Sequence, residues 1–181
     1  KCNQAISIKY PLTEIATGIL FFLSFNAIPK NIIFEKFALN LFSSWALILI
    51  LLPISIIDYE FLWIPNSIIM IGCLFGFSAS IFSAILNNQN IVITIFETLI
   101  SGISGFLTII LIMKFGSLIF KKPSMGLGDS KLAGMLGLWV GFPGVIISIW
   151  LSFIISGLFV ILGFASKKIK KGQLIPFGPF L

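Results

Sequence analysis

Long apolar segments recur along the whole chain and leave little room for any other kind of structure. Separated by breaks rich in charged, Pro, Gly or Asn residues, they run over residues 12–28, 37–57, 65–86, 91–113, 129–142 and 144–165. A helix needs about 20 apolar residues to cross a bilayer, and recurrence along the chain excludes a lone signal peptide. We therefore expect an all-α, polytopic membrane helix bundle with about six transmembrane helices.

The composition excludes a soluble domain and favours the lipid bilayer as the solvent. Hydrophobic residues make up 58% of the 181 residues, charged residues only 10%, and the mean hydropathy is +1.13. Six acidic residues and twelve lysines cannot cover the surface of a soluble domain of this length. Nucleic acid is not an expected partner, because the lysines are spread along helix ends without a base-stacking platform.

The fifth apolar segment differs from the others because it is short and rich in glycine. Gly134, Gly137 and Gly141 lie within residues 129–142. Small residues of this kind allow helices to approach closely. This pattern indicates close helix packing or a tilted, partly water-facing element, and not a helix that faces lipid.

The lysines predict the orientation of the chain in the membrane. If the chain starts inside, only Lys30 and Lys36 of the twelve lysines fall outside, and cytoplasmic loops carry the excess of positive charge. The same orientation assigns Asp58 to the loop after the second segment and Asp129 to the end of the loop before the fifth. Both aspartates are therefore expected at the cytoplasmic face.

Acidic residues that border bilayer segments cost free energy unless they are paired, hydrated or used. Water can reach Asp58 and Asp129 at helix ends, and two carboxylates flanked by apolar helices do not both ionise readily. An ionised carboxylate can take a proton from water while a protonated one donates to a carbonyl oxygen, as peptide hydrolysis requires. Gly126 and Gly128 leave space beside Asp129 for unusual backbone torsions or for an approaching peptide backbone.

Two other interpretations of these acids stay open at this point. "GLGD" before a helix is also a plain way to turn a chain and to N-cap the helix with Asp129. Glu97, inside the fourth segment, could bond a neighbouring hydroxyl group, or could join Asp58 and Asp129 in the relay of a proton-coupled transporter. A second aspartate in "IDYEFLWIPNSI", expected on the same membrane face, favours a matched acid pair.

At these residues the chain resembles the type IV prepilin peptidases, which are membrane-embedded aspartic proteases of the Gly-x-Gly-Asp kind. "GLGDSKL" is similar to the family pattern Gly-x-Gly-Asp-x-Lys-Leu, and "DYEFLWIPN" to its aspartate followed by proline and Asp or Asn. "CNQAISIKYPLTE" resembles the end of the family's cytoplasmic zinc-binding loop, with Cys2 in the place of the last of four cysteines. "PFGPFL", at residues 176–181, resembles the segment before the family's final helix.

The resemblance implies an aspartic endopeptidase that removes the short basic leader from prepilins or pseudopilins. Asp58 and Asp129 would form the catalytic dyad, at the cytoplasmic face of the bacterial inner membrane, with no cofactor for cleavage. Other residues of the motifs would bind substrate or shape the loops around the dyad: Gly126, Gly128, Lys131, Pro65 and Asn66. Presenilin-type and archaeal signal-peptide-peptidase-type proteases share Gly-x-Gly-Asp but place tyrosine before the first aspartate, where this chain has Ile57.

Longer members of the family also methylate the new pilin N-terminus with S-adenosylmethionine, using a domain built around four cysteines. Here only Cys2 of that set is present, and one thiolate cannot complete a tetrahedral zinc site. Zinc and S-adenosylmethionine are thus expected only if the full protein has the N-terminal region. We expect residues 1–181 to be one transmembrane peptidase domain, a core fragment without that region and the last helix. Residues 1–11 would be a remnant of a cytoplasmic loop and 166–181 a basic cytoplasmic loop.

Overall fold

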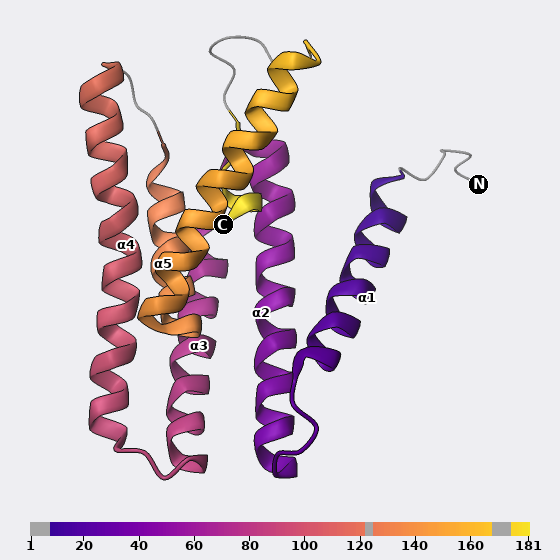
Figure 1. Ribbon diagram of the computed structural model, residues 1–181, viewed down its shortest axis with the longest axis vertical. Coiled ribbons are helices and arrows are strands. Elements are labelled where there is room, and N and C mark those ends of the chain that lie inside the picture. The colour runs from indigo at the N-terminus through magenta and orange to yellow at the C-terminus, as the bar shows by residue number, and fades with distance from the viewer. Residues whose placement is uncertain (1–7, 122–124, 168–174) are drawn as a thin grey trace.

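The structure is built from helices, as expected for an apolar chain whose backbone hydrogen bonds must be satisfied without water. The computed structural model describes residues 8–121, 125–167 and 175–181. No strand occurs among these residues, so the predicted all-α class is confirmed. The elements in chain order are α1 (Lys9–Ala27), α2 (Phe34–Phe61), α3 (Asn66–Leu86), α4 (Ile91–Phe120), α5 (Leu127–Ala165) and the short 3₁₀-helix η1 (Gly178–Phe180) (Figure 1).

Four of the described helices are long and apolar enough to cross a membrane, so six spans are not confirmed. They are α2, α3, α4 and α5. Helix α1 is not among them, and its 19 residues include the polar Lys9, Glu14 and Asn26. The expected fifth and sixth segments both belong to α5.

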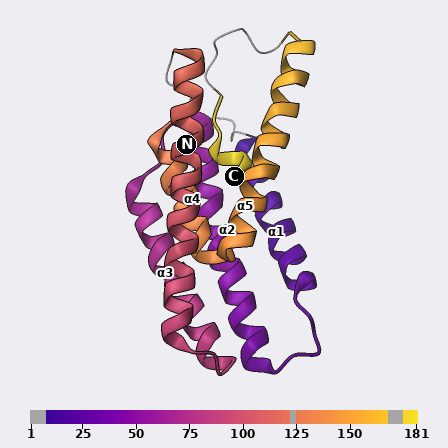
Figure 2. The same cartoon turned by 60° about the vertical axis from the view of Figure 1, so that its left-hand side comes forward.

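Helix α5 turns back on itself at Gly141, which divides it into a first arm (127–140) and a second arm (142–165). Gly141 has φ 73° and ψ 176°, a conformation that essentially only glycine adopts. Pro143 follows, where its missing N–H costs little near the start of the second arm. Figures 1 and 2 show the resulting V. At about 1.5 Å per residue, the first arm extends only about 20 Å.

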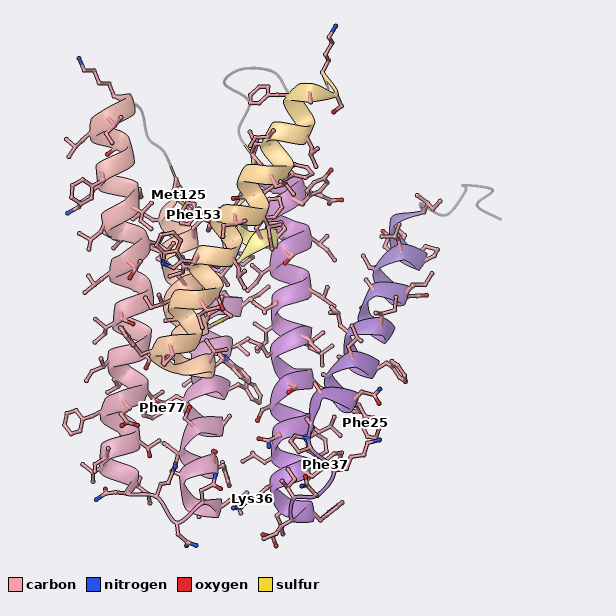
Figure 3. All side chains as sticks on the ribbon, in the orientation of Figure 1. Phe25, Lys36, Phe37, Phe77, Met125 and Phe153 are labelled. Atoms are coloured by element: carbon pink, nitrogen blue, oxygen red, sulfur yellow. The ribbon has the colours of Figure 1, made fainter. Side chains whose placement is uncertain are left out.

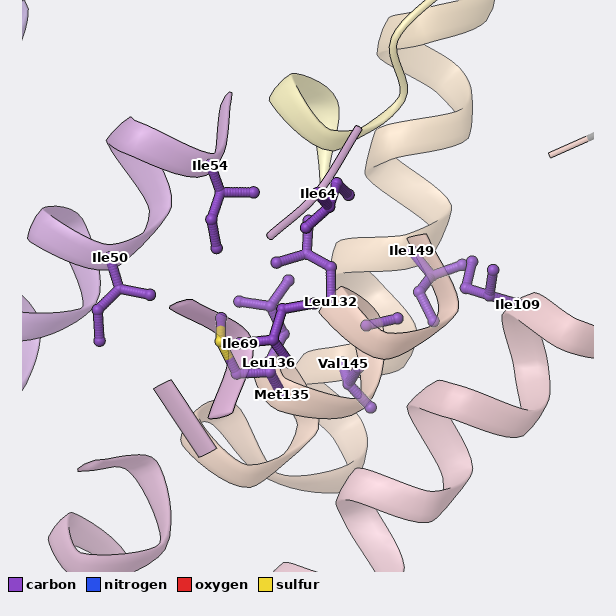
Figure 4. Close-up of a cluster of buried hydrophobic side chains, with 11 residues drawn as sticks. Ile50, Ile54, Ile64, Ile69, Ile109, Leu132, Met135, Leu136, Val145 and Ile149 are labelled. Atoms are coloured by element: carbon purple, nitrogen blue, oxygen red, sulfur yellow. The ribbon is translucent and has the colours of Figure 1, made fainter. Parts of the chain in front are cut away.

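The first arm of α5 forms the centre of the hydrophobic core. Leu132, Ala133 and Met135 in this arm are fully buried. They belong to a cluster with residues of α2, α3, α4 and the second arm of α5 (Figure 4): Ile50, Ile54, Ile69, Ile109, Val145 and Ile149. At Gly137 an added Cβ would collide with the carbonyl oxygen of Ser101 in α4. The prediction of close helix packing for this segment is therefore confirmed.

Away from this core, large apolar side chains point outward, as Figure 3 shows. Leu74, Leu118 and Trp150 are 71%, 74% and 68% exposed. Such surfaces suit a chain surrounded by lipid. Helix α1 packs mainly on α2, where the rings of Phe21 and Trp45 stack with centroids 5.0 Å apart.

Asp58 and Asp129 both lie within helices, near a helix end, which corrects their assignment to the adjoining loops. Helix α2 continues past Asp58 to Phe61 and ends where Leu62 adopts a left-handed conformation with φ 53°. The Leu62 N–H donates to the Asp58 carbonyl oxygen at 2.9 Å, which closes the last turn. Asp129 lies in the first turn of α5. The end of α2 and the start of α5 lie at the same end of the bundle (Figure 1).

Candidate active site

Asp58 and Asp129 line the same cavity, although they come from helices far apart in the sequence. Its volume is about 310 Å³. Both residues are nearly buried, with exposed fractions of 5% and 8%. Four predicted motif residues also line the cavity: Asn66, Gly126, Gly128 and Lys131. The sequence predicted a shared membrane face, and the structure adds that the two acids border one space.

The local structure at Asp129 differs from the simple cap that "GLGD" allowed. Gly126 is the N-cap of α5, and Asp129 is the third helical residue. The Gly126 N–H donates to Asp129 Oδ2 at 3.3 Å, so the carboxylate reaches back to the helix start, as the acidic residue of a capping box does. The alternative interpretation, in which Asp129 itself is the N-cap residue, is therefore wrong.

The glycines beside Asp129 do not need unusual torsions, which corrects the other expectation for them. Gly126 has ordinary extended angles, φ −84° and ψ 152°, and Gly141 is the only glycine with positive φ in the described part of the chain. Close packing explains Gly128 instead. A Cβ there would lie 3.2 Å from Cβ of Ile64, so glycine lets the start of α5 approach the α2–α3 connection.

Asp58 receives a hydrogen bond that the sequence did not predict. The backbone N–H of Gly178, in η1, donates to Asp58 Oδ2 at 2.8 Å. Gly178 is buried, and the contact joins residues 120 positions apart. The sequence signal for this contact is "PFGPFL" at residues 176–181, whose resemblance to the family does not by itself predict a role for Gly178.

A second polar contact joins the starts of α3 and α5 at the cavity. Lys131 Nζ donates to Asn66 Oδ1 at 2.8 Å. Pro65 precedes Asn66 in an extended conformation, φ −68° and ψ 122°, as the N-cap of α3. It is not among the residues that line the cavity. Pro65 therefore directs the chain into α3, while Asn66 and Lys131 border the cavity itself.

Apolar residues complete the wall, and sequence reasoning did not select them. They are Leu62, Trp63, Ile64 and Leu127. Each lies within six residues of one of the two aspartates in the sequence, which is the signal that could have identified them. Such a wall lowers the local dielectric and strengthens electrostatic interactions between the two carboxylates.

Glu97 lies at a different site from the two aspartates. It lines a cavity of about 440 Å³ near the turn of α5, together with Thr98, Ser101 and Gly141. Ser101 Oγ donates to the backbone carbonyl of Glu97 at 2.6 Å. The structure therefore does not bring Glu97 to the cavity of Asp58 and Asp129.

The described residues do not fit a zinc site of the kind that the sequence resemblance raised. Within residues 8–121, 125–167 and 175–181, no three His, Cys, Asp or Glu side chains come together as metal ligands. Cys73 is a free, half-buried thiol that packs on the core, and Cys2 lies outside the described residues. We derive no chemical step through zinc or S-adenosylmethionine.

Comparison with known proteins decides the family. The type IV leader peptidase family matches residues 45–161, which is more than half of the chain and includes both aspartates. The chain belongs to the type IV leader peptidase family. No solved structure matches the chain.

Relatives of this chain include proteins named prepilin leader peptidase/N-methyltransferase. Those of Stutzerimonas stutzeri, Pseudomonas aeruginosa and Neisseria gonorrhoeae are 28%, 27% and 25% identical to it. Each alignment covers 99% of this chain and 57% of the relative. The chain therefore spans little more than half the length of these relatives. The resemblance to a type IV prepilin peptidase core is confirmed.

Proposed function

We propose that the protein is an aspartic endopeptidase that removes the basic leader from type IV prepilins or pseudopilins. Asp58 and Asp129 are the catalytic dyad. The observation that carries this proposal is their position: two nearly buried carboxylates from different helices line one cavity of about 310 Å³. Such a volume lies at the lower end of the range for ligand pockets, and it can accept a short extended segment of peptide.

In the proposed reaction the two carboxylates have complementary roles. The ionised one takes a proton from a water molecule, whose oxygen attacks the scissile carbonyl carbon, while the protonated one donates to the carbonyl oxygen. As the tetrahedral intermediate breaks down, the carboxyl group that took a proton from water gives it to the leaving amine, and the other carboxylate takes back the proton that it had donated to the carbonyl oxygen. The apolar wall, including Trp63 and Ile64, limits competing water and strengthens the interactions of the dyad with the substrate.

The proposed site lies at the cytoplasmic face of the bacterial inner membrane. Among the described lysines, Lys121, Lys131 and Lys167 lie at helix ends near the end of the bundle that holds the dyad (Figure 1). Lys30 and Lys36 lie near the α1–α2 connection, at the opposite end (Figure 3). Positive charge is concentrated on cytoplasmic ends of membrane proteins. This distribution supports the cytoplasmic orientation.

The proposal is restricted to peptide cleavage. The relatives' names include N-methyltransferase activity, but methyl transfer is not assigned to this chain, because its described residues supply no metal-binding group. A proton-coupled transport path through Glu97 is less well supported, since Glu97 lines a separate cavity. The family match likewise favours a prepilin peptidase over presenilin-type proteases.

Cleavage of a prepilin with a basic leader, by the full-length protein in liposomes, tests the proposal. Asp58→Asn and Asp129→Asn should each lower the rate by about 10²–10⁴-fold, since each removes one member of the acid–base pair. Glu97→Gln is the matched control and should keep nearly the wild-type rate. The proposal fails if wild type does not cut, or if both Asn variants still cut.

A further inference from the structure

Residues 175–181 return to the end of α2 and place η1 beside the proposed dyad. η1 packs against α2 and against α5. Figures 1 and 2 show it between α2 and the second arm of α5. The sequence assigned residues 166–181 to a basic loop, but Gly178 in this segment is hydrogen-bonded to the proposed catalytic residue Asp58.

The contact at Asp58 requires glycine. The Gly178 N–H donates to Asp58 Oδ2 at 2.8 Å, and a Cβ on Gly178 would lie 2.7 Å from the same oxygen and 3.2 Å from Cγ. Any side chain at this position would push the carboxylate away. Glycine is therefore the residue that lets a backbone donor come this close.

The second arm of α5 holds η1 in place. Ser152 is 1% exposed, and its Oγ lies 2.6 Å from the carbonyl oxygen of Phe180 and 2.7 Å from that of Ser148, so that its one hydrogen is shared between these two acceptors. Two ring contacts add to this bond: Phe153 with Phe177 at 4.9 Å between centroids, and Phe159 with Phe180 at 5.4 Å. The position of Gly178 is thus set by the second arm of α5, whereas Asp129 lies in the first arm of the same helix.

We propose that Gly178 is a positioning residue for the dyad, held by Ser152 through η1. Its N–H anchors Oδ2 of Asp58, so that Oδ1 is the oxygen presented to the shared cavity and to the reacting water. This inference rests on the proposed peptidase function. A backbone donor suits the task because it cannot accept a proton and has no side chain that could rotate away.

The test compares two variants of Gly178 and one of Ser152 in the full-length protein. Replacement of the Gly178 amide by a backbone ester removes the donor without added bulk, Gly178→Ala adds the clash, and Ser152→Ala loosens η1. Gly157→Ala is the control, because Gly157 lies on the same arm of α5 as Ser152 and a Cβ there would meet no atom within 4 Å. Prepilin cleavage gives kcat and KM, and labelling of Asp58 with a carbodiimide and an amine, read by mass spectrometry, reports its anchoring.

We expect kcat to fall by about 10²-fold for Gly178→Ala, as for a catalytic group displaced by about 1 Å. The ester and Ser152→Ala variants should lose several-fold in kcat. For the ester variant, KM and the thermal unfolding temperature should stay near those of wild type. The rate of Asp58 labelling, divided by that of Glu35 in the same sample, should be higher in the ester and Ser152→Ala variants than in wild type. Gly157→Ala should match wild type in both measurements.

Unchanged kcat and unchanged Asp58 labelling in the ester variant overturn the inference, even where Gly178→Ala is inactive or unfolds. In that case Asp58→Asn and Asp129→Asn still abolish cleavage, so the proposed function stands alone. If wild type does not cut, or both Asn variants still cut, the peptidase function fails and the positioning role fails with it.

Discussion

Lys131 donates from Nζ to Oδ1 of Asn66 at 2.8 Å, which joins the second turn of α5 to the start of α3 beside the cavity that Asp58 and Asp129 line. The two residues belong to different sequence motifs, 65 positions apart. The contact therefore links the segment that follows one aspartate to the helix that carries the other. It is exposed, so its contribution to stability is expected to be small.

Substitutions at this contact should separate hydrogen bonding from charge. Asn66→Asp keeps an acceptor and should retain most of the cleavage rate, because the bond from the charged Lys131 ammonium becomes an ion pair with a carboxylate. Asn66→Leu removes the acceptor and should slow cleavage about two- to tenfold, in proportion to one lost hydrogen bond. Initial rates of prepilin cleavage measure both effects. Equal losses in Asp and Leu variants would show that the bond has no part in activity.

Gly141→Ala should destabilise the protein by about 1–3 kcal/mol. Space is not the cause, since a Cβ at Gly141 meets nothing within 4 Å. The cost comes from φ 73° with ψ 176°, which a residue with a Cβ adopts only under strain. Unfolding in mixed detergent micelles measures the change. Gly18→Ala, also with nothing within 4 Å but in a helix, is the control and should be neutral or slightly stabilising.

Gly137→Ala should destabilise the core through overpacking, by about 1–3 kcal/mol. The new Cβ would collide with the Ser101 carbonyl and lie 2.9 Å from Cα of Gly102. These are backbone atoms of α4, so no side-chain rotation relieves the clash. The same unfolding measurement applies, and a wild-type stability for Gly137→Ala would mean that α4 and the first arm of α5 are not in close contact.

Trp139 and Gly76 should show energetic coupling. Trp139 Nε1 donates to the Gly72 carbonyl at 2.9 Å, and a Cβ on Gly76 would lie 2.6 Å from the same nitrogen. Trp139→Phe should cost about 0.5–1.5 kcal/mol for the lost hydrogen bond. Gly76→Ala should cost less in the Trp139→Phe background, because the smaller ring leaves space for the methyl group.

A double-mutant cycle of unfolding free energies measures this coupling. Ser78→Ala is a suitable control partner for Trp139→Phe, since Ser78 is exposed and bonds only the Phe75 carbonyl of its own helix in the described contacts. Its effect should add to that of Trp139→Phe. Additive costs for Gly76→Ala and Trp139→Phe would contradict the contact between them.

Much of the helical framework could be predicted from the sequence, because an apolar segment in lipid must satisfy its backbone internally and has few conformations available. The break near "GFPG" was also predicted correctly, since glycine and proline there interrupt the backbone hydrogen bonds of the helix. The helix ends were less predictable. Helix α2 continues to Phe61, beyond the apolar segment, because a helix can extend polar residues into the interface without losing hydrogen bonds.

The sequence by itself determined that this is a helical membrane protein with two acids at one membrane face and two motifs typical of prepilin peptidases. Only the tertiary structure decided that Asp58 and Asp129 line one cavity, that Gly178 bonds Asp58, and that the first arm of α5 is core. The physical reason is that lipid is as apolar as a protein interior. Apolar faces that meet lipid and faces that meet another helix therefore look alike in sequence, and packing chooses between them.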